Sequence, residues 1–309
     1  MELVEVVLQS RRGEGTLATH VVLGGRSAAA EALWASCDRP GMRVRLRAGE
    51  VEDEVGLASV PGAPFELLLE RASPLGDAVE ALEPGAPLLC SPAFGHGMPL
   101  GQFEGHDLYL IGHGAGLGPV RGVALAALAE RQRWRSVHVM CEAHFLRELP
   151  YRSEYPAWQR MGARVYQLFQ RPDMGKWRGS EAAYIYEELR DLGPDPERSA
   201  VFAAGPPELL AGVAGVMRAL EHEPRKLVLF ERTTIAPERA REPERPAELL
   251  EKISLEGIWG SGHQCDVPDH PPVHSTPAEQ PRPLGMPRYK EAAKRLAAGE
   301  PLPLPGGAH

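Results

Sequence analysis

A glycine-rich turn between a short apolar run and a helical pattern offers the clearest chemistry in this sequence. The apolar run covers residues 108–111, and the helical pattern covers residues 120–130. Glycines let the backbone approach a phosphate closely, and a helix N-terminus offers free N–H groups and a positive dipole end. We therefore expect an anion site here; the alternative is an ordinary strand-to-helix turn. The turn consists of Gly112, His113, Gly114, Ala115, Gly116, Leu117, Gly118 and Pro119.

Two further groups follow predicted strands in the same half of the chain. Glu142 ends the apolar run of residues 136–141, and a second glycine turn, Ala204-Gly205-Pro206-Pro207, ends the run that starts at residue 199. Ligands of parallel sheets bind at the carboxyl ends of the strands, so these groups should lie beside the first turn. Glu142 could hold an adenosine ribose and reject a 2′-phosphate, which favours NADH; the alternative is a solvated loop carboxylate.

Two histidines lie in glycine loops, His113 in the first turn and His96 between Gly95 and Gly97. Histidine titrates near neutrality, so either could contact a phosphate or shuttle a proton. The alternative is a polar loop residue at the surface.

Arginines and a possible metal set are weaker candidates. Arg121, Arg147 and Arg152 could pair with phosphates, although arginines on helix surfaces are usually only solvated. A zinc ion could be held by a group with suitable spacing. The prolines within that group and the lack of a second cysteine pair argue against it, so we predict no metal site. Its members are His263, Cys265, His270 and His274.

The elements that must position these groups fall into three parts. Residues 1–103 read as short strands separated by turn residues, which predicts a small antiparallel β-barrel. In residues 104–235 strands alternate with helices, which predicts a parallel sheet covered on both faces. Residues 236–309 are rich in proline, which suits an extended arm and a tail. Predicted strands of the first part cover residues 3–8, 17–23, 42–47, 55–60, 65–71 and 87–90, with a helix at 77–82; helices of the second part cover 120–130, 151–161, 182–191 and 208–221.

Composition narrows the partners. The chain has 309 residues and a net charge of −8, which does not favour nucleic acid or an anionic membrane as a partner. No apolar run reaches the roughly 20 residues of a membrane span. Four scattered cysteines are typical of a reduced, cytoplasmic protein rather than a disulfide scaffold.

Nine segments, in order, resemble the motifs of the ferredoxin–NAD(P)H reductase family. The resemblance is greatest to the branch with electron-transfer subunits of dihydroorotate dehydrogenase and flavin subunits of sulfhydrogenases. The segments are Pro40-Gly41, Leu57-Ala58-Ser59, Leu82-Glu83-Pro84-Gly85, Ser91 to Gly97, Gly114 to Pro119, Leu146 to Trp158 (with Tyr151-Arg152-Ser153-Glu154 and Trp158), Trp177-Arg178-Gly179, Ala204 to Glu208, and Ile253-Ser254-Leu255-Glu256.

The resemblance implies a function as well as a fold. It implies an FAD site at Leu57, Ala58, Ser59, Gly95, His96 and Gly97. It implies an NAD(P) site at the two glycine turns, and transfer of electrons to a partner redox protein or a larger complex.

Several residues depart from the family's pattern. Asp53 and Glu54 stand where the family has an arginine for the flavin pyrophosphate, and no aromatic covers the ring; acidic groups there would repel phosphate. Ala115 replaces a threonine, and Ala204 replaces a cysteine. The loop for a two-iron cluster keeps a single cysteine, Cys265, where four thiolates are needed. We therefore expect NAD(H) binding, leave FAD binding open and expect no iron–sulfur cluster.

Two hypotheses follow. The first is an electron-transfer subunit that binds NAD(H), and FAD if the barrel retains it, and passes electrons to a partner. The second is a reductase-like subunit without catalysis, with a structural or nucleotide-sensing role in a larger assembly.

Overall fold

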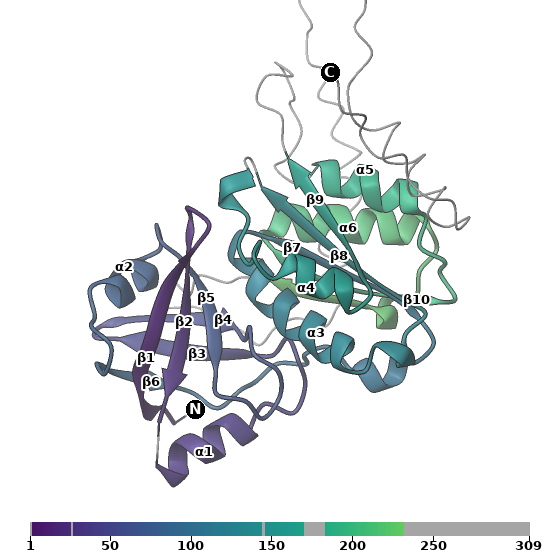
Figure 1. Ribbon diagram of the computed structural model, residues 1–309. Helices are drawn as coiled ribbons and strands as arrows, with labels where there is room; N and C mark the ends of the chain where they lie inside the picture. Colours follow the sequence, from purple (N-terminus) through teal and green to yellow (C-terminus); the bar gives the residue numbers. More distant parts are fainter. Residues whose placement is uncertain (1, 26, 144–145, 170–182, 232–309) are drawn as a thin grey trace, which may run out of the picture. The chain divides into compact units, whose positions relative to one another are not determined.

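Two β-sheets form the framework of the part of the chain that the structure describes (Figure 1). This is a computed structural model, and it describes residues 2–25, 27–143, 146–169 and 183–231. Both sheets belong to one compact unit, Met1–Ser261. The first sheet is antiparallel and contains β1 (Val4–Glu14), β2 (Ala18–Gly24), β3 (Arg43–Ala48), β4 (Val51–Gly56), β5 (Glu66–Glu70) and β6 (Pro87–Cys90).

The antiparallel sheet closes on itself. Its order is β4-β3-β6-β1-β2-β5, so β4 and β5 are the edges. Beyond the end of β4, Leu57 bridges Leu67, and the Ala58 N–H donates to the Glu66 carbonyl over 2.7 Å. Closure removes free strand edges and encloses an apolar core, as in a small barrel.

The position of β4 corrects the sequence-based strand at residues 55–60. The strand runs from Val51 to Gly56 because its acidic residues face basic residues of β3. Arg45 pairs with Glu54, and Arg47 with Glu52, in the register of the two strands. Opposite charges directly across an antiparallel strand pair stabilise the pairing of the two strands. The alternation of apolar residues in the sequence does not reveal this contribution.

The second sheet is parallel, with the order β11-β10-β7-β8-β9. Alternate residues of its strands face opposite sides: Leu108 and Leu110 pack with α3, whereas Tyr109 and Ile111 pack with α5 and α6. Helices therefore cover both faces, with α3 and α4 on one side and α5 and α6 on the other (Figure 1). The strands are β7 (Asp107–His113), β8 (Ser136–Ala143), β9 (Ala163–Phe169), β10 (Ser199–Gly205) and β11 (Leu227–Glu231); the helices are α3 (Leu117–Ala129), α4 (Tyr155–Arg160), α5 (Ala183–Leu192) and α6 (Pro207–Ala219).

Two helix predictions need correction, and one further helix was not predicted. A helix not predicted from sequence, α1 (Ala28–Ala35), begins at Ser27, whose side chain accepts from the Ala30 N–H. The helix expected at 77–82 is α2 (Pro74–Glu80), capped in the same way by Ser73. The helix expected from residue 151 begins only at Tyr155, because Tyr151 has a left-handed φ of 56°.

The predicted fold class is confirmed: an antiparallel β domain precedes a parallel α/β domain. The boundaries at 103/104 and 235/236 stay predictions. Among the described residues no helix is both long and apolar enough to cross a membrane. Cys37, Cys90 and Cys141 are buried free thiols.

An aromatic stack lies on the α5/α6 face of the parallel sheet. His138 stacks on Tyr109 with a centroid distance of 4.5 Å and lies 5.8 Å from the ring of Tyr166, whose hydroxyl is 3.0 Å from His138 Nδ1. The Ser136 hydroxyl, 2.7 Å from His138 Nε2, also contacts Asp107. Burial, and then the charge of Arg164, lower the pKa of His138 from 6.5 to about 4.

We expect this stack to make stability depend on pH. Because the folded pKa is the lower one, the neutral ring stabilises the fold fully above pH 6.5, and that contribution is lost as pH falls toward 4. By pH 5 the loss should be on the order of 2 kcal/mol. Urea unfolding at pH 7.5 and pH 5 measures it, with His138→Phe as a non-titrating control. An equally steep loss in that variant would contradict the assignment.

Candidate functional site

The carboxyl edge of the parallel sheet brings three of the predicted site groups together. Strand register places His113 of β7 beside Glu142 of β8, and Gly112 beside Ala204 of β10. A Cβ added to Gly205 would lie 3.4 Å from that of His113. His113 is half-buried between the two neighbouring strands, whereas Pro206 and Pro207 continue outward to the start of α6.

Glu142 does not lie where its predicted role requires. The sequence places it just after a strand, but β8 continues to Ala143, and Glu142 is fully buried at 0% exposure. Its register position beside His113 puts it on the α5/α6 face. A ribose at the surface cannot reach a carboxylate at that depth, so Glu142 gives no reason to prefer NADH over NADPH.

The glycines of the first turn mostly allow close packing between protein segments. A Cβ on Gly116 would lie 2.2 Å from the Ala204 carbonyl oxygen, and one on Gly112 would lie 2.7 Å from the Leu117 side chain. A Cβ on Gly118 would lie 3.0 Å from that of Leu68 in β5. A side chain at any of these three positions would therefore collide with protein, whether or not the backbone contacts a ligand. Gly116 itself has an ordinary right-handed φ of −60°.

Gly114 is the member of the turn that needs a glycine for its conformation. Its φ is 55°, and it is half-buried, with the Glu70 carboxylate 3.6 Å from where a Cβ would stand. Gly114 and Ala115 precede α3, so their backbone is the part of the turn that a phosphate could approach.

The residues of the expected flavin site lie in two segments that both contact Met42: the Leu57 N–H donates to the Met42 carbonyl over 2.9 Å, and a Cβ on Gly97 would lie 3.0 Å from the Met42 side chain. Leu57, Ala58 and Ser59 are buried under α3, where a Cβ on Gly122 would lie 2.8 Å from the Ser59 carbonyl oxygen. The loop of Gly95, His96 and Gly97 packs on the turn before β3: a Cβ on Gly97 would lie 2.8 Å from the Pro40 carbonyl oxygen, and His96 is exposed.

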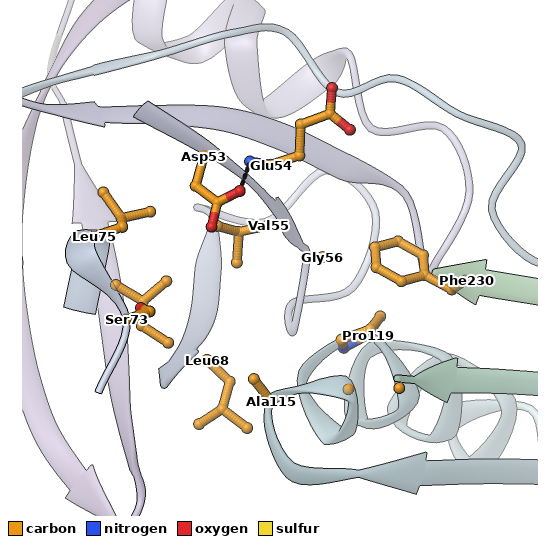
Figure 2. A pocket seen from close by; sticks show the side chains of 13 residues that line it. Asp53, Glu54, Val55, Gly56, Leu68, Ser73, Leu75, Ala115, Pro119 and Phe230 are labelled. Carbon is orange, nitrogen blue, oxygen red and sulfur yellow. Dashed lines mark hydrogen bonds between the residues drawn. The ribbon is translucent and has the colours of Figure 1, made fainter. Parts of the chain in front are cut away.

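A pocket lies where β4 meets the start of α3 and the ends of β10 and β11 (Figure 2). Its cavity volume is about 20 Å³. The cavity opens into a wider space of about 380 Å³, part of which is open solvent. The walls are largely apolar, and the backbones of Gly56, Gly116 and Gly205 contribute to them. Side chains on the walls include Asp53, Val55, Leu68, Leu75, Pro119 and Phe230.

The pocket contains one buried carboxylate. Asp53 is 4% exposed, points into the pocket and accepts from the Glu54 N–H over 2.8 Å (Figure 2). Glu54 points away and forms ion pairs with Arg43 at 3.3 Å and Arg45 at 3.4 Å. The Arg43 guanidinium also lies 4.4 Å from the centre of the Phe230 ring. Two arginines therefore pair with Glu54, whose side chain points away from the pocket, whereas the Asp53 carboxylate points into it.

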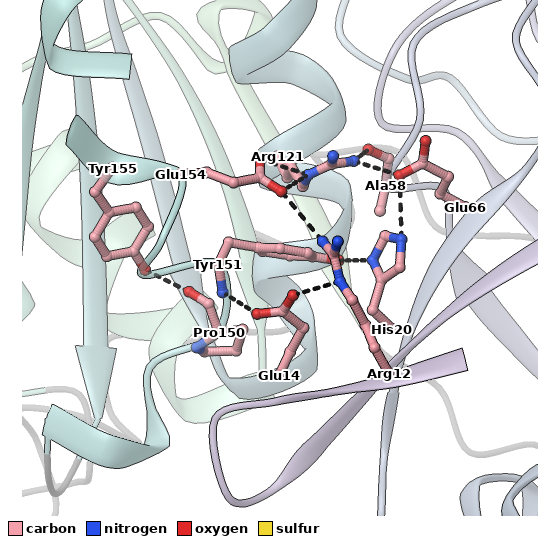
Figure 3. A network of polar contacts seen from close by, with 10 residues as sticks. All are labelled: Arg12, Glu14, His20, Ala58, Glu66, Arg121, Pro150, Tyr151, Glu154 and Tyr155. Carbon is pink, nitrogen blue, oxygen red and sulfur yellow. Dashed lines mark hydrogen bonds and ion pairs between the residues drawn. The ribbon is translucent and has the colours of Figure 1, made fainter. Parts of the chain in front are cut away.

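A network of polar side chains joins the two sheets and centres on Arg121 of α3 (Figure 3). Its guanidinium donates to the Ala58 carbonyl over 2.9 Å and to the Glu66 carboxylate over 2.7 Å. On its other side it donates to Glu154 over 2.9 Å, and it lies 5.0 Å from the centre of the Tyr151 ring. Arg121 is thus committed to protein groups, which excludes the phosphate role considered for it. Arg147 and Arg152 are exposed.

His20 of β2 extends the network. Its Nδ1 lies 3.0 Å from the Tyr151 hydroxyl, and its Nε2 lies 3.2 Å from Glu66. Burial raises the pKa of Tyr151 well above its usual value, so the hydroxyl keeps its proton and can donate to Nδ1. The hydrogen bond from His20, and then the charge of Arg121, lower the pKa of Glu66 despite its partial burial.

Tyr151 is held in an unfavourable backbone conformation by this network. It is fully buried with a φ of 56°, and its N–H donates to Glu14 over 2.9 Å. A left-handed φ in a bulky residue costs on the order of 1–3 kcal/mol, which the surrounding contacts must offset. Glu14, His20 and Glu66 were not predicted as site residues; a polar residue within the apolar alternation of β2 is the signal that could have indicated His20.

No protein-family model matches the chain. Over 183 residues it is 27% identical to sulfhydrogenase 1 subunit gamma of Pyrococcus furiosus, an alignment that spans 57% of this chain and 61% of that protein. Among solved structures, a ferredoxin–NADP⁺ reductase from Neisseria gonorrhoeae with bound FAD and NADP superposes with a TM-score of 0.60 over 75% of this chain and 99% of its own, at 17% identity. The chain has the ferredoxin–NAD(P)H reductase fold.

Two other reductase-fold structures agree with this assignment. An Amycolatopsis cytochrome P450 reductase gives a TM-score of 0.61 at 19% identity and covers 74% of this chain and 70% of its own. A Malassezia yamatoensis flavohemoglobin with bound FAD and heme gives a TM-score of 0.59 at 17% identity and covers 75% of this chain and 61% of its own. The resemblance inferred from the sequence motifs is confirmed; those at residues 177–179 and 253–256, and the expected cluster loop, lie outside the described residues.

We expect Gly116→Ala to destabilise the reductase fold. The added Cβ would lie 2.2 Å from the Ala204 carbonyl oxygen, so α3 or β10 must shift, at a cost of about 2 kcal/mol or more. Gly101→Ala is the matched control, because nothing lies within 4 Å of its Cβ position. Chemical unfolding compares the two. Equal midpoints would show that the turn tolerates a side chain.

We expect Glu66→Gln to weaken the network by about 1–3 kcal/mol at pH 7. Because the folded pKa of Glu66 is lowered from 4.5, its contribution is present above pH 4.5 and is lost as pH falls through the folded value. The difference from wild type in urea unfolding should therefore shrink below pH 4.5. The control is Glu104→Gln, which removes an exposed ion pair with Arg133 and should have little effect. A difference independent of pH would contradict this role.

Proposed function

We propose that this chain is a nicotinamide-nucleotide-binding subunit of a larger redox assembly. NAD(H) would dock along the carboxyl edge of the parallel sheet. Its pyrophosphate would lie at the backbone of Gly114 and Ala115, and its nicotinamide would lie against Gly205 and Pro206. The observation that supports this best is that the turn before α3, the start of α3 and the end of β10 contribute Ala115, Pro119 and Gly205 to one pocket. The site offers backbone N–H groups and a helix dipole, and little acid–base chemistry of its own.

The residues of the pocket do not fit FAD. The flavin motif of the family coincides with its Asp53–Gly56 wall, where the arginine for the pyrophosphate is replaced by a buried carboxylate and the aromatic by Val55. A carboxylate repels the pyrophosphate. These features support a nucleotide-binding or nucleotide-sensing role without flavin.

A flavin-dependent electron-transfer subunit is the second candidate. The Neisseria reductase, with the same fold, holds both FAD and NADP. In this chain Phe230 offers an aromatic ring at the pocket wall that could cover a flavin from another side. In this candidate the hydride of NAD(H) would pass to FAD, which supplies the redox chemistry.

A partner protein is part of either proposal. The relative from Pyrococcus furiosus is by name a subunit of a sulfhydrogenase. We propose that this chain likewise assembles with a redox partner. Co-purification from the native host, with identification of the bound protein, tests this.

We expect the purified protein to be colourless and to bind FAD weakly or not at all, because Asp53 lies where a cation is required. Absorbance at 450 nm and a titration with FAD measure this. The variant Asp53→Arg/Val55→Tyr restores the missing pair and should raise the affinity for FAD by about tenfold. FAD retained stoichiometrically by the wild type would favour the electron-transfer candidate.

About two irons per chain after anaerobic purification would contradict the expected lack of a cluster.

A further inference from the structure

A group of arginines lies at the amino edge of the parallel sheet, opposite the edge proposed for the nucleotide. Strands β8 and β9 begin at this edge, with Ser136 and Ala163. Five residues from the loop before β8 and from the segment around the start of β9 form what we call the arginine surface. They are Arg131, Arg135, Arg160, Met161 and Arg164.

Contacts hold the two segments of the arginine surface together. The Arg131 guanidinium donates to the Gly162 carbonyl over 3.0 Å and to the Trp134 carbonyl over 2.6 Å. Strand register places Arg164 beside His138. Burial, and then the charges of Arg164 and Arg131, lower the pKa of that histidine. Arginines from both segments therefore lie close to one point of the edge.

Part of the positive charge at this edge is compensated within the protein. Arg133, in the same loop, forms ion pairs with Glu104 and Glu130. Arg135 lies 3.6 Å from the Asp107 carboxylate. These carboxylates are used up by the two arginines of the loop.

Three arginines of the surface keep an uncompensated charge. Arg160 and Arg164 are exposed, and no carboxylate of the described residues forms an ion pair with either of them. The groups that bind Arg131 are carbonyls, which do not cancel its charge. Met161, between Arg160 and Arg164 in the chain, adds an apolar side chain that is 43% exposed. Arginine and methionine are enriched where proteins bind one another.

We propose that the arginine surface binds an acidic segment of a partner protein. The inference rests on the proposed function, because it requires that the chain assembles with a partner, and it adds the place and the charge of the contact. Guanidinium groups bind carboxylates through two parallel hydrogen bonds. The chain as a whole has a net charge of −8, so an acidic partner is repelled by much of the protein and directed to this surface.

A partner at this edge leaves the nucleotide edge open. Strand β8 has 8 residues, so the two edges of the sheet lie on the order of 25 Å apart. The chain can then hold a nucleotide and a partner at the same time. This arrangement suits the nucleotide-sensing or structural role better than transfer of electrons across the contact itself.

The variant Arg160→Gln/Arg164→Gln tests the charge of the surface. Both side chains are exposed, so the fold should be kept, which thermal unfolding checks. The matched control is Arg39→Gln/Arg47→Gln, which removes the same charge from two solvent-accessible side chains of the β-barrel. Each full-length protein is used to co-purify the partner from the native host. Each is also titrated with a short fluorescent peptide of glutamates around one leucine.

We expect wild type and control to retain the same partner and to bind the peptide at about 20 mM NaCl. The variant should lose the partner and about tenfold in affinity for the peptide. If all three proteins retain the partner equally, the inference is wrong and the proposed function stands.

If the wild type retains no partner, the proposed function is wrong, and the peptide decides the inference. Binding that is about tenfold weaker in the variant supports it, whereas equal binding or none contradicts it. Tighter binding of the wild type to a DNA duplex, or to vesicles that contain anionic lipid, would contradict an acidic protein as the partner.

Discussion

The Arg121 guanidinium is the interaction on which the candidate site depends. It lies between the Glu66 carboxylate of the β-barrel and the Glu154 carboxylate just before α4, and it also binds the Ala58 carbonyl. These contacts hold the start of α3 against residues 56–59, so that Gly118 and Gly122 approach β5 and the Ser59 carbonyl closely. A partly buried cation between two carboxylates gains stability only when its geometry satisfies every donor. His20 of β2 contacts both Glu66 and the Tyr151 hydroxyl, and the Tyr151 N–H donates to Glu14 of β1. These contacts connect the Arg121 network to β1 and β2.

The same close packing shapes the pocket. Because α3 lies so near β4, the space between Asp53, Gly116 and Gly205 is narrow and mostly apolar. A fold that holds FAD and NADP in the Neisseria reductase thus contains, in this chain, a carboxylate with apolar neighbours. The scaffold that presents a nucleotide is retained, while the groups that would neutralise a flavin pyrophosphate are replaced. This combination favours a subunit that binds a nicotinamide nucleotide and leaves redox chemistry to a partner.

The sequence predicts the architecture well and the contacts less well. Strand–helix alternation and the order of the glycine turns were enough for the fold class, because apolar periodicity is a local property. The acidic β4 was misplaced because cross-strand charge pairing with β3 is not local. Glu142 was predicted at the surface, and Gly116 was predicted to face a phosphate, because burial and close approach depend on segments that are distant in the chain. The network of Glu14, His20, Glu66 and Tyr151 depends on four such segments.

The central claim is that a nicotinamide nucleotide docks at the carboxyl edge of the parallel sheet, beside the pocket that contains Asp53. Amide chemical shifts of the isotope-labelled protein, recorded during a titration with NAD⁺, test this most directly. The account predicts that the largest changes occur at Gly114, Ala115 and Gly205, with smaller ones at Asp53 and Phe230. Saturable changes confined to other strands, or none at millimolar NAD⁺, would contradict it.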